Sequence, residues 1–275
     1  MVALSAIVAL GGAIGWRADA GWKAVTIVRR AGAIEASLSF ETRRTNNSPA
    51  ATYAYRAMHL VVRRASRIIL DESRLPPVEG QVALGLRNVW GNGDDEALIE
   101  IQTGGNTCCS QVEIGVVDGR MGRVLLHNFG MSWRGVRHGA GFDFVSSDDR
   151  FYCAFADCAS SSEPVQIFMI DVAGDRFIDV TRSRVDVVSR DAAQRWNDFL
   201  RSRQKRAFYD PAGALAPWCA DEYLLGHRAV CDHGLNYALA HGYLRGWHDG
   251  YEGDVQGGRA FVKLLKGALH VWGYG

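Results

Sequence analysis

The chain has 275 residues, of which 48% are hydrophobic and 22% are charged, so it can bury one large core or two smaller ones. Its formal net charge of +1 excludes a global electric field that would draw it to nucleic acid or to an anionic membrane surface. Arginine doublets do occur, and we interpret them as solvated strand ends and turns: Arg29/Arg30, Arg43/Arg44 and Arg63/Arg64.

Residues 1–20 have the pattern of a signal peptide. The apolar run from Val2 to Trp16 is too short to span a bilayer, which takes about 20 apolar residues, and Ala18-Asp19-Ala20 follows as an A-x-A cleavage pattern. No Lys or Arg precedes the run, although signal peptides normally begin with positive charge. We expect export with cleavage after Ala20, and the alternative is a buried N-terminal helix. No other segment approaches membrane-spanning length, so we expect no membrane span in the mature chain.

Residues 21–188 have the pattern of a β-rich domain. Short segments rich in β-branched and aromatic residues alternate with Gly, Asn, Asp and Ser turns. This spacing predicts a mainly β fold, either an antiparallel sandwich or incomplete propeller-like sheets. The expected strands are 23–30, 33–43, 53–64, 66–70, 96–103, 110–119, 123–129, 142–155, 164–172 and 184–188.

Residues 189–275 have helical periodicity. Trp196, Phe199 and Leu200 share one face of a first helix. The last helix has a single apolar stripe, formed by Phe261, Leu264, Leu265, Ala268 and Leu269. No low-complexity linker separates this part from the strands, so we expect a C-terminal helical segment docked on the β-domain.

Six cysteines stand in three sequence-local pairs: Cys108 with Cys109, Cys153 with Cys158, and Cys219 with Cys231. No C-x₂-C pair and no histidine at zinc-finger spacing accompanies them, which favours disulfides in an oxidising compartment over a metal site. The doublet is ambiguous, because neighbouring strand residues point to opposite faces while consecutive Cα atoms lie only about 3.8 Å apart. Spacing leaves open whether its two cysteines bond each other or distant partners.

Asp148, Asp149 and Arg150 form the densest charged cluster of the β region. Paired carboxylates can act as general acid and base or bracket a glycosidic bond. Consecutive strand residues diverge, however, so we interpret the three as a turn with an ion pair and as a candidate binding site. Five histidines fall in the helical part, and none has H-E-x-x-H spacing: His227, His233, His241, His248 and His270. The sequence also contains no G-x-S-x-G motif, no P-loop and no G-x-G-x-x-G motif between a strand and a helix.

Two blocks of the sequence carry a resemblance to known proteins. They read NVWGNGDDEALIEIQTGGNTCC (88–109) and DDRFYCAFADCASSSEPVQIFMIDVAGDRFIDVTR (148–182). They resemble a group of uncharacterised secreted bacterial proteins with a GGAHCC-type cysteine doublet and degenerate FG-GAP/VCBS-like repeats. Two such units cannot close a propeller, which needs about four to eight blades.

The resemblance implies acidic loops that bind calcium. In this chain Asn88, Trp90 and Asn92 stand at the three aspartate positions. Calcium takes six to eight oxygen ligands and a Trp side chain supplies none, so we expect no cofactor. The remaining metal candidates are Asn88, Asn92, Asp94 and Glu96.

The resemblance also implies a bond between Cys108 and Cys109, since related proteins have no evident partner for the doublet. Cys219–Cys231 then joins two helical segments, and Cys153–Cys158 remains. Residues five apart on a straight strand lie about 16 Å apart, so the Cys153–Cys158 bond requires a turn around residues 156 and 157. The main alternative is that the cysteines of this pair exchange partners with those of the doublet, so that Cys153 and Cys158 bond Cys108 and Cys109.

Export and the absence of catalytic motifs favour a non-catalytic binding or structural protein of the bacterial envelope, with an envelope glycan or protein as its partner and no nucleic acid. One alternative is an extracytoplasmic hydrolase acting on glycan or peptide through Asp148, Asp149 or the histidines. Another is a weakly calcium-dependent adhesion module.

Overall fold

The computed structural model describes twelve strands, two short 3₁₀ helices and four α-helices. The residues described are 21–45, 53–73, 75, 77–91, 95–102, 112–118, 123–139, 141–171, 176–203, 210–245, 247 and 257–275, with the backbone alone for 112–118 and 123. The strands are β1 (Lys23–Ala31), β2 (Ile34–Arg44), β3 (Tyr53–Arg64), β4 (Arg67–Glu72), β5 (Val78–Arg87), β6 (Glu96–Gln102), β7 (Val112–Asp118), β8 (Arg123–Leu125), β9 (Arg134–His138), β10 (Gly141–Ser147), β11 (Val165–Asp171) and β12 (Arg176–Asp179). The helices are η1 (Asp149–Phe151), η2 (Thr181–Ser183), α1 (Val185–Ser202), α2 (Pro211–Leu224), α3 (Arg228–Ala240) and α4 (Gly258–Val271).

The first sheet is antiparallel and runs in the order β1-β2-β3-β5-β6-β7-β8, with β4 paired to β3 beside this path. Strand β3 changes partner along its length: Arg64 at its end pairs with β4, and Tyr53 at its start pairs with β5. The inward side chains of β2, β3 and β4 therefore share one core with those of β5 and β6. On β2, buried residues alternate strictly with half-buried ones from Ile34 to Phe40, as expected for a strand with one face in a core. This sandwich-like arrangement confirms the predicted class, mainly antiparallel β with C-terminal helices.

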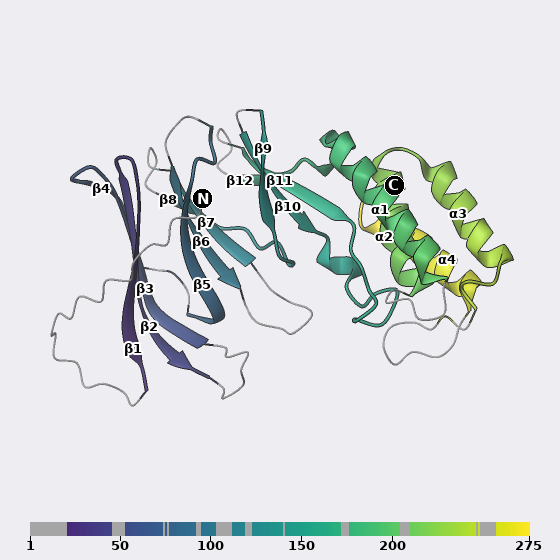
Figure 1. Cartoon of the computed structure of the whole chain (residues 1–275), viewed down its shortest axis with the longest axis horizontal. Helices are drawn as coiled ribbons and strands as arrows, with labels where there is room; N and C mark the ends of the chain where they lie inside the picture. Colours follow the sequence, from purple (N-terminus) through teal and green to yellow (C-terminus); the bar gives the residue numbers. More distant parts are fainter. Residues whose placement is uncertain are drawn as a thin grey trace.

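The second sheet, in the order β12-β11-β10-β9, lies between the first sheet and the helices (Figure 1). Phe144 and Phe168 on one face pack with Leu98 and Leu125 of the first sheet. Val145 and Ile167 on the other face, by contrast, pack with Val188 of α1. Covering on both faces explains why β10 is buried continuously over residues 143–146 rather than at alternate positions.

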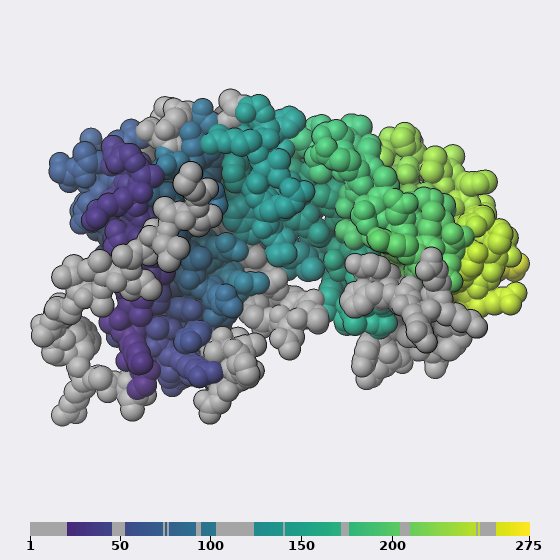
Figure 2. All heavy atoms as spheres, viewed as in Figure 1, coloured from purple at the N-terminus to yellow at the C-terminus, as the bar shows by residue number. Residues whose placement is uncertain are grey.

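The four helices form a separate hydrophobic core with α2 at its centre. Every residue of α2 from Ala212 to Glu222 is buried, which is typical of a helix surrounded by other elements. Asp210 caps its start by accepting the Ala212 N–H at 2.7 Å, and Pro211 occupies the first helical position, where its missing N–H costs nothing. Helices and sandwich lie at opposite ends of an elongated molecule (Figure 2). None of the helices in the described ranges has both the length and the apolar character needed to cross a membrane.

Four sequence expectations differ from the structure. The strand expected over residues 123–129 ends at Leu125. Residues 184–188, expected as a strand, contain the start of α1, because Val188 belongs to the same buried helix face as Ala192 and Phe199. The strand expected over residues 142–155 ends at Ser147, where the chain enters η1. Strands β5, β9 and β12 were not expected; β9 is half-buried at one position and exposed at the others, so it shows no apolar alternation.

Candidate functional site

A pocket of about 380 Å³ lies where the second sheet meets the helices. Its wall comes from η1, the start of β11, the turn from β12 into η2, the end of α2 and the segment after α4. The lining side chains are mostly polar or aromatic: Arg150, Val165, Gln166, Asp179, Val180, Thr181, Arg182, Ser183, Leu224, Trp272, Gly273 and Tyr274.

Arg150 reaches the pocket from a rigid turn. The carboxylate of Asp148, which is only 2% exposed, accepts the Arg150 backbone N–H at 3.1 Å and thereby starts η1. The guanidinium donates to the same carboxylate through Nε at 2.8 Å and Nη2 at 2.5 Å, a two-point geometry that fixes its plane. Its Nη1 donates to the Trp272 carbonyl at 3.2 Å, and the group lies 5.4 Å from the Trp272 ring centre. Arg150 therefore links the sheet to the C-terminal segment.

Asp179 and Thr181 form another part of the pocket wall. Thr181 donates its backbone N–H to the Asp179 carboxylate at 2.8 Å and its hydroxyl to the same oxygen at 2.5 Å. The Thr181 hydroxyl oxygen also accepts the Ile167 N–H at 2.8 Å, so the turn is bound to β11. Gln166 donates to the other Asp179 oxygen at 3.3 Å. These bonds leave Gln166 and Asp179 at the pocket surface in a fixed orientation.

Arg182 and Tyr274 hold the last residues of the chain in place. Arg182 donates through Nη2 to the Gly273 carbonyl at 2.9 Å and to the Tyr274 carbonyl at 2.8 Å. The Tyr274 hydroxyl donates to Asp148 at 2.8 Å. Burial, and then the nearby Asp148 carboxylate, raise the pKa of Tyr274 above its usual range, so this phenol stays a donor at every physiological pH.

Of the three residues predicted as a candidate binding site, only Arg150 lines the pocket. Asp148 lies behind it, between Arg150 and Tyr274, while Asp149 points to Gly130, where an added Cβ would lie 2.2 Å from the Asp149 carboxylate. Burial, and then Asp148, raise the pKa of Asp149 above its usual value. The two carboxylates therefore diverge and do not bracket a common substrate position.

No histidine is among the described residues that line the pocket. His227 lies 3.1 Å from Glu222, and His241 contacts the Tyr237 carbonyl at 2.8 Å. His248 lies outside the described residues.

The predicted calcium loop is only partly described, because Asn92 and Asp94 lie outside the described residues. Glu96 is buried, and its carboxylate accepts the Val89 N–H at 2.7 Å and the Trp90 N–H at 3.4 Å. It thus binds the backbone of the loop. Within the described ranges, no three His, Cys, Asp or Glu side chains are grouped as a metal site.

Two of the predicted disulfides are present. Cys153–Cys158 has a Cα–Cα distance of 4.4 Å, and the chain bends between its two cysteines. Cys219–Cys231 joins α2 to α3 with a Cα–Cα distance of 5.0 Å. Structural disulfides of this kind are typical of an oxidising, extracytoplasmic environment. The predicted bond between Cys108 and Cys109 lies outside the described residues.

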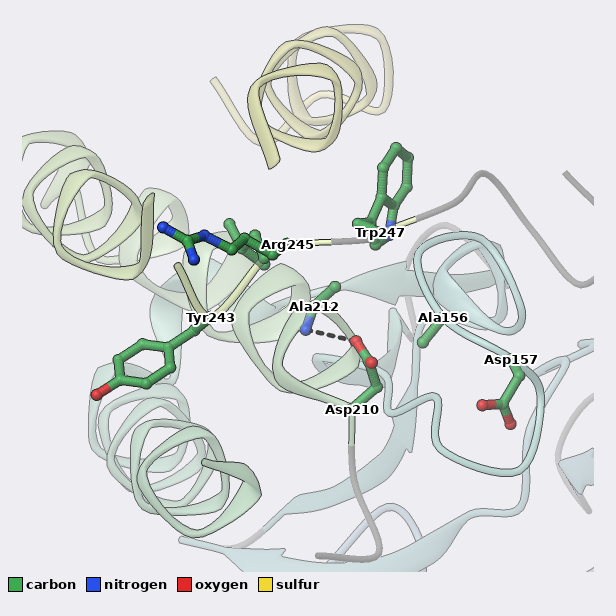
Figure 3. Close-up of a pocket in the computed structure, with 8 residues that line it drawn as sticks. Ala156, Asp157, Asp210, Ala212, Tyr243, Arg245 and Trp247 are labelled. Carbon is green, nitrogen blue, oxygen red and sulfur yellow. Dashed lines mark hydrogen bonds between the residues drawn. The ribbon is translucent and has the colours of Figure 1, made fainter. Parts of the chain in front are cut away.

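A smaller pocket of about 80 Å³ lies beside the start of α2 (Figure 3). Asp210 uses one carboxylate oxygen to cap that helix. Tyr243 and Arg245 extend away from Asp157 on the other side of the pocket. Its polar side chains do not converge on one point, so we favour the larger pocket as the functional site.

Sequence reasoning missed most of the larger pocket. Gln166 and Arg182 were not singled out, because no local motif marks them, and Trp272 was interpreted as one of the aromatic residues that pack in the helical part. Besides the charge cluster that contains Arg150, a local signal was the Asp-x-Thr spacing of Asp179 and Thr181, which is typical of a side-chain-capped turn. Comparison of the chain with protein-family models, with curated proteins and with solved structures found no match.

Proposed function

We propose that the chain is an exported, non-catalytic binding protein of the bacterial envelope and that its larger pocket binds a glycan. The observation that carries this proposal is the pocket lining. Arg150, Gln166, Asp179 and Arg182 supply donors and acceptors to a pocket that Trp272 also lines. A polar, hydroxyl-rich ligand can satisfy such groups while one apolar face of a sugar ring packs on the indole.

Binding is favoured over hydrolysis by the state of the nearby carboxylates. Asp148 is buried and bonded to Arg150 and Tyr274, and Asp179 is bonded to Thr181 and Gln166. A general acid needs a carboxyl group that can exchange its proton with the substrate. Asp148 and Asp179 are already engaged in bonds within the protein, which favours binding over hydrolysis. Export is supported by the two disulfides and by the resemblance of residues 88–109 and 148–182 to secreted bacterial proteins.

The test is calorimetric titration of the purified protein with soluble peptidoglycan fragments. We expect Gln166→Ala to weaken binding about fivefold, the effect of one lost hydrogen bond. The matched control is Gln194→Ala on α1, which also removes an amide-to-carboxylate bond, 3.0 Å to Asp198, but does not line the pocket. Equal weakening by both variants, or no heat with the wild-type protein, would contradict the glycan site. New reducing ends in the mixture would contradict the non-catalytic assignment.

A further inference from the structure

Two successive hairpins of the first sheet end in the same six-residue pattern, Arg-Arg-Ala-x-x-Ile. Residues 29–34 read RRAGAI and residues 63–68 read RRASRI. In each hairpin the arginine doublet lies at the end of the first strand and small uncharged residues form the turn. The pattern therefore places cationic side chains at the end of both hairpins.

The strand register brings the two ends together. Arg30 pairs with Glu35, which pairs with Arg63, and on the neighbouring row Ile34 pairs with Arg64, which pairs with Arg67. The turns are also joined, because the Ala65 N–H donates to the Ala33 carbonyl at 2.7 Å. At about 4.8 Å per strand, the arginines lie within about 15 Å across four strands. We call this group the arginine tip: Arg29, Arg30, Arg63, Arg64 and Arg67.

The arginine tip has a strong local excess of positive charge. Glu35 is the one carboxylate among the described residues of these two rows, and it pairs with Arg30 at 2.5 Å. Further along the strands, Asp71 lies 2.6 Å from His59. The whole chain has a net charge of only +1, but the Debye length is about 8 Å at physiological ionic strength. A surface that touches the tip therefore responds to this local charge rather than to the balance of the whole molecule.

The arginines point to both faces of the sheet. Residues on one strand alternate between faces, so Arg30 and Arg63 lie on the outer face, and Arg29 and Arg64 lie on the face that continues the core. Ile68, which pairs with Arg63, is 47% exposed. The hairpin ends lie at the end of the molecule away from the helices (Figures 1 and 2). A linear polyanion lying on one face would meet only part of this charge, whereas a headgroup layer can surround the tip.

We propose that the arginine tip docks the protein on an anionic lipid surface. The arginines contact lipid phosphates on both faces of the hairpins, and Ile68 with the small turn residues enters the interfacial layer. The pocket takes no part in this contact, so docking does not depend on the proposed function.

The test is co-sedimentation with vesicles of phosphatidylcholine, with and without about 30% phosphatidylglycerol. We expect the wild-type protein to bind the anionic vesicles and to be released by salt. Each arginine near an anionic surface changes partition about fivefold, so Arg30→Gln with Arg67→Gln lowers it about 30-fold. The matched control is Arg190→Gln with Arg259→Gln. Arg190 is 74% exposed and paired with Asp186, as Arg30 is 74% exposed and paired with Glu35.

Both variants change the net charge equally, so a loss confined to the tip variant supports docking at the tip. Equal partition of the two variants, or equal binding to neutral and anionic vesicles, would overturn it. A soluble polyanion is the competing partner, and dextran sulfate is its probe. Binding to dextran sulfate without binding to the anionic vesicles would overturn the assignment to lipid.

Discussion

Asp221 on α2 is a buried carboxyl group, and we expect it to destabilise the fold at neutral pH. It is 0% exposed, and no described residue donates a hydrogen bond to either of its oxygens. The Asp191 carboxylate on α1 already accepts the Val165 N–H at 3.1 Å and Arg195 Nε at 3.4 Å. Burial first, and then Asp191, raise the pKa of Asp221 well above its usual range. When Asp221 carries a proton it can donate to Asp191, so protonation replaces a repulsion with a hydrogen bond.

The sign of the pH dependence follows from this raised pKa. Below the unfolded-state pKa, about 3.9, Asp221 is protonated in both the folded and the unfolded state, so it adds no pH dependence to the free energy of unfolding. Between that value and the raised folded-state pKa, only the folded state holds the proton, so stability falls as pH rises, by up to about 1.4 kcal/mol per pH unit. Asp221→Asn removes this loss and supplies an N–H donor to Asp191. Because an unsatisfied buried polar group costs about 1–3 kcal/mol, we expect that gain in unfolding free energy near neutral pH and little gain near pH 4.

Urea unfolding of wild type and Asp221→Asn, followed by circular dichroism at several pH values from about 4 to 8, measures this difference. The control is Asp198→Asn on α1, because Asp198 is also buried but accepts bonds from Gln194 and Arg201. Removing that paired carboxylate should lower stability rather than raise it. A variant Asp221→Asn that is less stable than wild type near neutral pH, or a gain that does not change with pH, would refute the reasoning.

Three further predictions concern stability. Replacing Cys219 and Cys231 with alanine should lower the free energy of unfolding by about 3 kcal/mol, and replacing Cys153 and Cys158 should lower it by about 2 kcal/mol. The first effect is larger because the Cys219–Cys231 bond closes the longer loop and so removes more chain entropy from the unfolded state. Urea unfolding of the two variants should show this order. Ala57 has a left-handed φ of 51° at a bulge of β3, so Ala57→Gly should stabilise the chain by up to about 1 kcal/mol in the same assay, and a loss would argue against strain there. Millimolar calcium and a chelator should give the same melting temperature, and a rise with calcium would restore the adhesion module as an explanation.

Strands with long apolar or alternating runs were predictable from the sequence, and strands with a weak apolar signal were not. Strand β2 alternates along its buried length, and its pairing with β1 and β3 follows from short turns. Strand β5 contains Gly80 and Gly85, which interrupt the apolar pattern, and β12 has no buried residue. The start of α1 was misread because Val185, Val187 and Val188 have high β propensity, and tertiary packing of Val188 overrides it.

The candidate site was predictable only where its contacts are local. The Asp148–Arg150 ion pair joins residues two apart in the sequence, and charge clustering suffices to propose it. Tyr274 reaches Asp148 across 126 residues, and Arg182 reaches the Tyr274 carbonyl across 92. No spacing rule predicts contacts of that separation, because they depend on how the helices pack against the second sheet.

The same contacts that form the pocket also hold the C-terminal segment on the sheet, so the proposed binding of a ligand there would be coupled to the stability of both parts. The pocket exists only when η1, the turn after β12 and the segment after α4 are assembled, so the unfolded chain has no equivalent site. A ligand at 100 times its dissociation constant then stabilises the fold by about 2.7 kcal/mol. Since the lining residues come from both the second sheet and the helical part, that gain must appear in the unfolding of both. Substitution of Arg182 or Tyr274 changes the fold and the site together, whereas Gln166 changes the site while leaving the contacts of the C-terminal segment in place.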